Sequence, residues 1–195
     1  MDSVKNIILF ASGSGSNVEN IAGAFRSEPR IRIRAVFGNN LKAGVIERCA
    51  RLGLPFYGFS RDAFRDTEGF TAVLGALDPD LIVLAGFLWK IPEGVVQAFE
   101  GRILNIHPAL LPAYGGKGMY GMNVHRAVVA NREGRSGITV HYVNAEYDEG
   151  AVILQRGVTV LPSDTPEAVA AKVHDLEYRY FPVAIRSVLF PEDGR

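Results

Sequence analysis

Four times between residues 6 and 99, a short apolar segment is followed by a polar or glycine-containing turn and then by apolar residues at helical spacing. This repeated strand–helix order predicts parallel strands joined by crossover helices. We therefore expect an α/β fold, with an open, mostly parallel sheet and helices on both faces. The four pairs are NIILFA with VENIAGAFR, IRIRAVFG with AGVIERCARLG, LPFYGF with AFRDTEGFTAVLGAL, and LIVLAGF with PEGVVQAFE.

Beyond Pro112 the pattern changes. The glycine-rich AYGGKGMYGMN precedes a helical VHRAVVANREG, and the loop NAEYDEG joins two strand-like segments, SGITVHYV and AVILQRGVTVL. So short a loop cannot hold the crossover that a parallel pair needs, so these strands should form an antiparallel C-terminal extension. A last helix is expected from Thr165 to Leu189, with Ser163 and Asp164 as caps.

Length and charge indicate one domain that acts on small molecules. The 195 residues fit a single domain, 1–195, with residues 1–100 as the α/β half and residues 101–195 as the second half. With 21 basic and 21 acidic residues, the chain has no charge excess to attract nucleic acid or a membrane surface. Its single cysteine, Cys49, excludes an intramolecular disulfide and sits at a helical core position, so we expect a cytoplasmic protein.

The segment SGSGSN, between the first strand and the first helix, is a candidate anion site. Small residues at a helix start expose backbone N–H groups that can bind a phosphate. A dinucleotide fingerprint is incomplete because Val18 stands where the third glycine should be after Gly13 and Gly15. A phosphomonoester is therefore favoured, and the alternative is a turn that only caps the helix.

The segment LNIHP places two polar side chains at the end of an apolar strand. The two-residue period of a strand puts Asn105 and His107 on one side and Ile106 on the other, and Pro108 favours an extended His107. Such an end is where open α/β sheets bind ligands. An amide and an imidazole there can stabilise an oxygen that gains negative charge during acyl transfer. The alternative is a structural histidine beside a turn-forming asparagine.

The loop EYDEG offers carboxylates that can orient an imidazole or accept a proton, although Asp and Gly are also ordinary turn residues. The other histidines, His125, His141 and His174, lack the spacing of metal ligands, so we predict no metal site. His141 lies in a predicted strand, where we expect it to be a structural hydrogen-bonding residue.

Taken in order, SGSGSN, VLAGF, LNIHPALLP, YDEGAVILQ and EYRYFP resemble the glycinamide ribonucleotide formyltransferase family, the folate-dependent enzymes of purine biosynthesis. The resemblance extends from Lys5 to Leu189 and implies a Rossmann-like formyltransferase fold. It also implies a phosphate-binding first half and a catalytic, folate-binding second half. The co-substrate would be 10-formyltetrahydrofolate, and the protein would be a monomer or a homodimer.

The family's site residues transfer to matching positions of this sequence. The catalytic residues implied are Asn105, His107 and Asp148. The substrate would be bound by Gly15, Ser16 and Asn17 at its phosphate and by Glu177 at its ribose. The pterin of the folate would lie between one segment, Leu88, Trp89 and Ile91, and the loop from Val143 and Asn144 to Asp148.

The resemblance implies direct attack of the substrate amine on the formyl carbon of 10-formyltetrahydrofolate. His107, as an imidazolium paired with Asp148, and the Asn105 amide would stabilise the oxyanion. Asp148, directly or through a water, would accept the proton of the amine. No covalent enzyme intermediate is needed.

Two departures from the family pattern affect this interpretation. Trp89 stands where many members have an arginine, and the segment from Gly115 to Asn123 is longer than the family's usual connection. This segment, with Lys117 in it, is either a glycine-hinged flap over the substrates or a passive surface loop.

Related enzymes share the Asn, His and Asp set. Methionyl-tRNA formyltransferase is expected to carry a further basic domain, which the balanced charge disfavours. Formyltetrahydrofolate deformylase is expected to lack the phosphate loop, and sugar-nucleotide formyltransferases remain a related alternative. A non-catalytic module of the same fold would bind ligand without turnover, which the complete residue set argues against.

Overall fold

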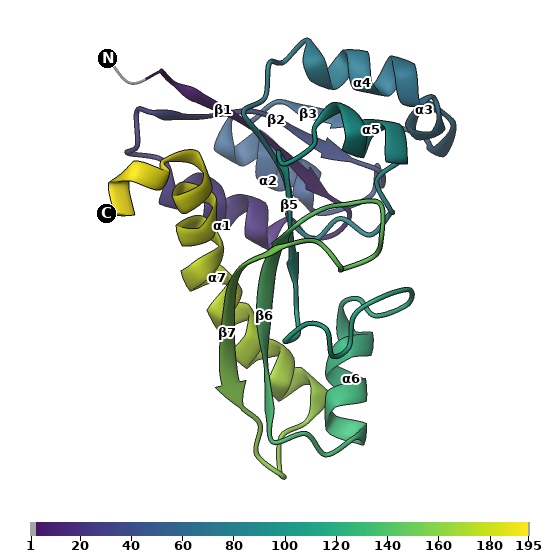
Figure 1. The fold of residues 1–195 in the computed structure, drawn as a ribbon, viewed down its shortest axis with the longest axis vertical. Helices are drawn as coiled ribbons and strands as arrows, with labels where there is room; N and C mark the ends of the chain where they lie inside the picture. Colours follow the sequence, from purple (N-terminus) through teal and green to yellow (C-terminus); the bar gives the residue numbers. More distant parts are fainter. Residues whose placement is uncertain (1–2, 195) are drawn as a thin grey trace.

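Seven strands form one sheet in the order β3-β2-β1-β4-β5-β6-β7 in the computed structural model, which describes residues 3–194 (Figure 1). Strands β1 to β5 pair in parallel, whereas β6 is antiparallel to both of its neighbours. This architecture confirms the predicted mostly parallel sheet with an antiparallel C-terminal extension. The strands are β1 Lys5–Ala11, β2 Ile31–Gly38, β3 Phe56–Gly58, β4 Leu81–Leu84, β5 Ile103–His107, β6 Arg135–Tyr142 and β7 Val152–Thr159.

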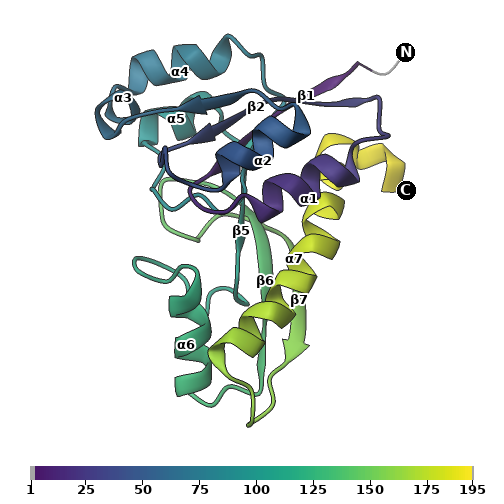
Figure 2. The same cartoon turned by 180° about the vertical axis from the view of Figure 1, so that it is seen from behind.

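Helices cover both faces of the sheet and enclose two apolar clusters. Helices α1, α2, α6 and α7 contribute to the larger cluster, and α3, α4 and α5 pack on the opposite face (Figure 2). Strand β4 is apolar throughout, and β1 is apolar from Ile7 to Ala11, because both faces of these strands are covered. The helices are α1 Ser16–Ala24, α2 Val45–Leu52, α3 Arg61–Arg65, α4 Thr67–Gly75, α5 Glu93–Ala98, α6 Met122–Ala130, α7 Pro166–Leu189 and the 3₁₀ turn η1 Pro191–Gly194.

Two details of the predicted helices are wrong. The cap of α7 is Thr165, whose side chain accepts from the Ala168 N–H, rather than Ser163 or Asp164. Asp164 instead accepts from the Leu161 N–H at 2.8 Å. The expected helix after β3 is divided at Asp66, because the Asp66 side chain caps a second helix, α4.

The C-terminal helix connects the two predicted halves. Helix α7 packs on α1, α6, β5 and β6, so that it spans the sheet from the first half to the second (Figures 1 and 2). At its end, Arg186 pairs with Glu28, and Arg30 pairs with Asp193. The two halves of the chain therefore share one sheet, and α7 contacts elements of both halves. Within residues 3–194 there is no helix with the length and apolar character that a membrane span requires.

Candidate active site

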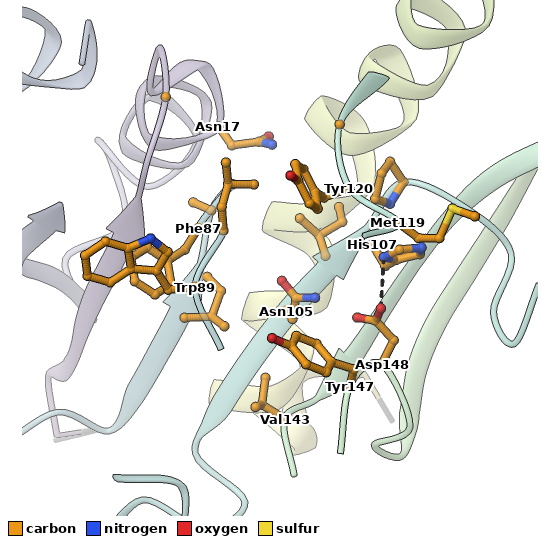
Figure 3. Close-up of a pocket in the computed structure, with 18 of the residues that line it drawn as sticks. Asn17, Phe87, Trp89, Asn105, His107, Met119, Tyr120, Val143, Tyr147 and Asp148 are labelled. Atoms are coloured by element: carbon orange, nitrogen blue, oxygen red, sulfur yellow. Dashed lines mark ion pairs between the residues drawn. The ribbon is translucent and has the colours of Figure 1, made fainter. Parts of the chain in front are cut away.

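A pocket of about 460 Å³ lies where β1, β4 and β5 end. Its volume falls within the range of about 300–1,000 Å³ that is usual for small-molecule sites. Three of its walls are the segments that directly follow these parallel strands, and the others include the glycine-rich segment, the loop between β6 and β7, and residues of α6 and α7 (Figure 3). The chain order reverses at β1, between β2 and β4, which is where open α/β sheets bind their ligands.

The predicted phosphate loop forms the start of α1. Gly15 adopts the left-handed conformation at φ 77°, and a side chain there would lie 2.6 Å from Val45. Helix α2 braces the loop, because the Val45 N–H donates to Gly13 and Arg48 donates to the Ser14 carbonyl at 2.7 Å. The first N–H groups of a helix have no partner within the helix, so those of Ser16 and its neighbours are available to an anion.

Glu177 links this loop to α7. Its carboxylate is 5% exposed, and its Oε2 accepts from Asn17 Nδ2 at 3.0 Å and from His174 Nδ1 at 2.8 Å. Its Oε1 has no hydrogen bond to any residue between 3 and 194 and remains available to a ligand. The hydrogen bond to Glu177 raises the pKa of His174, because the carboxylate favours the charged imidazolium.

Asn105 and His107 share one side of β5, as predicted. Both line the pocket, and Leu104 and Ile106 belong to the larger apolar cluster, although Ile106 also reaches the pocket. His107 is buried, and its Nε2 lies 2.7 Å from the Tyr114 carbonyl oxygen. A carbonyl can only accept, so Nε2 carries the proton and donates it. The other ring nitrogen, Nδ1, faces Asp148.

Asp148 approaches His107 from the loop between β6 and β7. Its Oδ2 lies 3.6 Å from His107 Nδ1 and accepts from the Gly116 N–H at 2.8 Å (Figure 3). Asp148 is left-handed at φ 58°, a conformation that Asp tolerates better than most residues. Two residues later, a Cβ on Gly150 would lie 1.7 Å from the Tyr142 carbonyl, so the D-x-G motif needs its glycine for close packing.

The two groups of this pair have pKa values that favour a neutral imidazole beside an ionised carboxylate. Burial lowers the pKa of His107 and outweighs the opposing effects of Asp148 and the Tyr114 carbonyl. Burial alone would raise the pKa of Asp148, but His141 and the Gly116 N–H lower it overall. The lowered pKa favours a neutral His107 in the free protein, whereas the imidazolium that we expect belongs to the proposed reaction.

His141 has a closer connection to the site than we expected. It lies opposite Asn105 in the β5–β6 register, and its Nδ1 donates to the Tyr142 carbonyl at 2.8 Å. Its Nε2 lies 3.2 Å from Asn105 Nδ2 and 3.7 Å from Asp148 Oδ1. His141 is thus a hydrogen-bonding residue, as predicted, but one that orients two candidate catalytic side chains.

The two segments expected to hold the pterin form facing walls of the pocket. All five predicted residues line it: Leu88, Trp89, Ile91, Val143 and Asn144. Between these segments, the Lys90 ammonium lies 5.0 Å from the centre of the Tyr147 ring. The Trp89 indole packs beside Phe59 and Phe64, with the Arg61 guanidinium 4.8 Å above it. Trp89 thus extends an aromatic cluster at the edge of the pocket.

The glycine-rich segment is a wall of the pocket. Residues 116–122 all line it, and the half-exposed Tyr120 lies between Asn17 and His107 in Figure 3. Lys117 lines the same cavity. The segment is therefore in place to touch a ligand, whether or not it moves as a flap.

Several groups that line the pocket were not predicted from the sequence to belong to the site. His125 and His174 line the pocket, and His125 Nδ1 has no hydrogen-bond partner within the described part of the chain. The three-residue spacing of His174 and Glu177 on a helix was a usable signal. The backbone groups of Tyr114 and Gly116 leave no such signal. Across residues 3–194, no group of three or more His, Cys, Asp or Glu side chains is arranged to hold a metal ion.

The sheet topology and the position of the pocket place the chain among α/β enzymes of Rossmann-like fold. The sequence model described as formyl transferase matches residues 5–185, and the chain belongs to this family.

Named relatives agree with that assignment. Phosphoribosylglycinamide formyltransferase of Escherichia coli is 35% identical over 185 residues, which cover 92% of this chain and 85% of that protein. The chloroplastic phosphoribosylglycinamide formyltransferase of Arabidopsis thaliana is 39% identical over 183 residues and 91% of this chain. The chain spans only 63% of that plant protein and 58% of its Vigna unguiculata counterpart.

A solved structure has the same fold. The crystal structure of phosphoribosylglycinamide formyltransferase from Anaplasma phagocytophilum superposes with a TM-score of 0.86 at 33% identity. The match covers 95% of this chain and 87% of that one.

Proposed function

We propose that this protein transfers the formyl group of 10-formyltetrahydrofolate to the amino group of 5′-phosphoribosylglycinamide, a step of de novo purine biosynthesis. The observation that carries the proposal is one pocket that joins a helix-start anion site, a buried glutamate and an Asn–His–Asp cluster. The relatives named above support the same reaction. The single cysteine and the balanced charge support a cytoplasmic enzyme acting on small molecules.

In this proposal the substrate phosphate binds the backbone N–H groups of Gly15, Ser16 and Asn17. The ribose hydroxyls donate to Glu177, whose Oε1 has no hydrogen bond within residues 3–194. Since Asn17 also bonds to Glu177, the two subsites are held at a fixed separation.

The folate is proposed to lie between the segment of Leu88, Trp89 and Ile91 and the segment of Val143 and Asn144. Apolar walls and backbone polar groups suit a flat heterocycle with several donors and acceptors. The formyl group on N10 would then face Asn105 and His107.

The chemistry is a direct acyl transfer. The substrate amine attacks the formyl carbon, a new C–N bond forms, and the bond from that carbon to N10 breaks after the tetrahedral intermediate. Asp148, directly or through a water, takes one proton from the attacking amine and delivers it to N10 as the bond from N10 to the formyl carbon breaks. The Asn105 amide stabilises the oxyanion, and His107 adds to this when its Nδ1 shares the proton that Asp148 has taken up.

The test is a formyl-transfer assay with both purified substrates, in which the formation of tetrahydrofolate is measured. A control reaction lacks 5′-phosphoribosylglycinamide. We expect folate turnover and formylated product only when the acceptor is present. Formate release at the same rate without the acceptor would instead identify a hydrolase.

A further inference from the structure

The first residues of the glycine-rich segment contact both members of the His107–Asp148 pair. The Tyr114 carbonyl accepts from His107 Nε2 at 2.7 Å, and the Gly116 N–H donates to Asp148 Oδ2 at 2.8 Å. His107 belongs to β5, whereas Asp148 lies in the loop between β6 and β7. The segment from Tyr114 to Gly116 therefore forms a backbone brace between two elements that are distant in sequence.

The brace is itself anchored to α6 at its first residue. The Tyr114 hydroxyl donates to Glu133 Oε1 at 2.7 Å and accepts from Asn131 Nδ2 at 2.8 Å, just beyond the end of that helix. Its backbone is held in uncommon conformations, because Tyr114 has φ 58° and Gly116 has φ 91°. Strained backbone of this kind persists where surrounding contacts over-determine it, and it often occurs at functional sites.

Each hydrogen bond of the brace has a specific chemical consequence. The carbonyl of Tyr114 requires a proton on His107 Nε2, which leaves Nδ1 as the ring atom beside Asp148. The N–H of Gly116 favours the ionised form of Asp148 and occupies one lone pair of Oδ2. The remaining lone pairs of the carboxylate are left for a proton from the substrate.

We propose that the brace from Tyr114 to Gly116 is a positioning element for the reaction, which fixes the tautomer of His107 and orients the Asp148 carboxylate for proton transfer. The inference rests on the proposed function, because it assigns a role in the same chemistry. The brace contacts the pair through backbone groups alone, the Tyr114 side chain anchors it to Glu133 and Asn131, and Gly116 has the positive φ that suits glycine.

Other groups also act on the pair. His141 of β6 lies 3.7 Å from Asp148, and His141 and Glu177 of α7 act on His107 through their charges. None of these belongs to the glycine-rich segment, so a change within it tests the brace separately from them.

The chain offers a matched pair of variants, Gly116→Ala and Gly118→Ala. Both glycines have φ near 90°, and a Cβ at either position would meet open space, so the two changes impose similar backbone strain. Of the two N–H groups, that of Gly116 bonds to Asp148. The Asp148 carboxyl carbon is followed by NMR against pH, and kcat/KM is measured over the same range.

We expect Gly116→Ala to weaken the hydrogen bond from residue 116 to Asp148 and so to raise the titration midpoint of Asp148. On the acidic side of the pH profile, kcat/KM should fall about tenfold, which is the size expected for loss of a hydrogen bond to a charged group. Gly118→Ala should leave the midpoint in place. Equal midpoints in wild type and Gly116→Ala, or equal shifts in both variants, would overturn the proposal. The NMR titration needs no turnover, so it separates failure of the brace from failure of the proposed reaction.

A measurement on the unmodified protein tests the brace even if the Gly116→Ala variant does not fold. The Gly116 amide proton should titrate with the same midpoint as Asp148, and this response should vanish in Asp148→Asn. The ring nitrogens of His107 should report the Nε2–H tautomer. A Gly116 amide that does not respond to pH, or an Nδ1–H tautomer, would contradict the brace.

Discussion

Asn17 and Glu177 are 160 residues apart in the chain, yet Asn17 Nδ2 donates to Glu177 Oε2 at 3.0 Å. The contact joins the first turn of α1 to the middle of α7, and it leaves Glu177 Oε1 free of hydrogen bonds to the described residues. In the proposed function, the phosphate and the ribose hydroxyls of the substrate would bind to two helices that already contact each other.

Replacing Glu177 with Gln should weaken binding of 5′-phosphoribosylglycinamide more than binding of the folate. The amide keeps the shape of the carboxylate but loses the charge, and hydrogen bonds to charged groups contribute about 1.5–3 kcal/mol. We expect KM for the ribonucleotide to rise roughly 10- to 100-fold by that measure, with KM for 10-formyltetrahydrofolate nearly unchanged. Parallel kinetics with each substrate varied will check this, and an equal rise in both constants would argue against a ribose site at Glu177.

The same variant should change the titration of His174. Glu177 raises the pKa of His174 in the folded protein, so the ion pair stabilises the fold fully at pH values below the unfolded pKa. That stabilisation is lost as pH rises through the raised folded pKa. NMR titration should give a lower pKa for His174 in Glu177→Gln than in wild type, and an unchanged pKa would exclude Glu177 as the cause.

Gly15→Ala should disrupt the anion site, and Gly13→Ala is its matched control. A methyl group on Gly15 would lie 2.6 Å from Val45 at a positive φ, whereas one on Gly13 would meet nothing within 4 Å. Strain of this kind costs on the order of 1–3 kcal/mol. Gly15→Ala should have a lower free energy of unfolding in urea and a lower affinity for inorganic phosphate than the wild type. Gly13→Ala should keep both values. Loss of phosphate binding in both variants would point to the sequence of the loop rather than its backbone geometry.

Asp148→Asn should keep the fold and lose most of the turnover. Asn also tolerates the left-handed conformation of this position, and it can still accept from the Gly116 N–H. A group that moves a proton in the transition state is worth roughly 10²- to 10⁴-fold in rate, so we expect kcat to fall by that factor. Retention of full turnover in the variant would remove Asp148 from the proton path.

Local sequence patterns predicted most of the fold and residues that line the pocket. Strands buried on both faces have continuous apolar runs, and the period of a strand places Asn105 and His107 on one side. The same rules failed where neighbouring polar residues competed. At the start of α7, three adjacent residues, Ser163, Asp164 and Thr165, are all capable caps, and the bond from Leu161 to Asp164 left that role to Thr165.

Periodicity and short-range backbone chemistry were enough to predict the order of strands and helices, the loop at Gly15 and the Asn–His pair. The tertiary structure alone decided which groups surround the pair. His141 comes to Asn105 through the β5–β6 register, and the Gly116 N–H comes to Asp148 through the path of a loop. Such contacts depend on long-range pairing and on backbone groups that every residue carries, so residue identity cannot encode them.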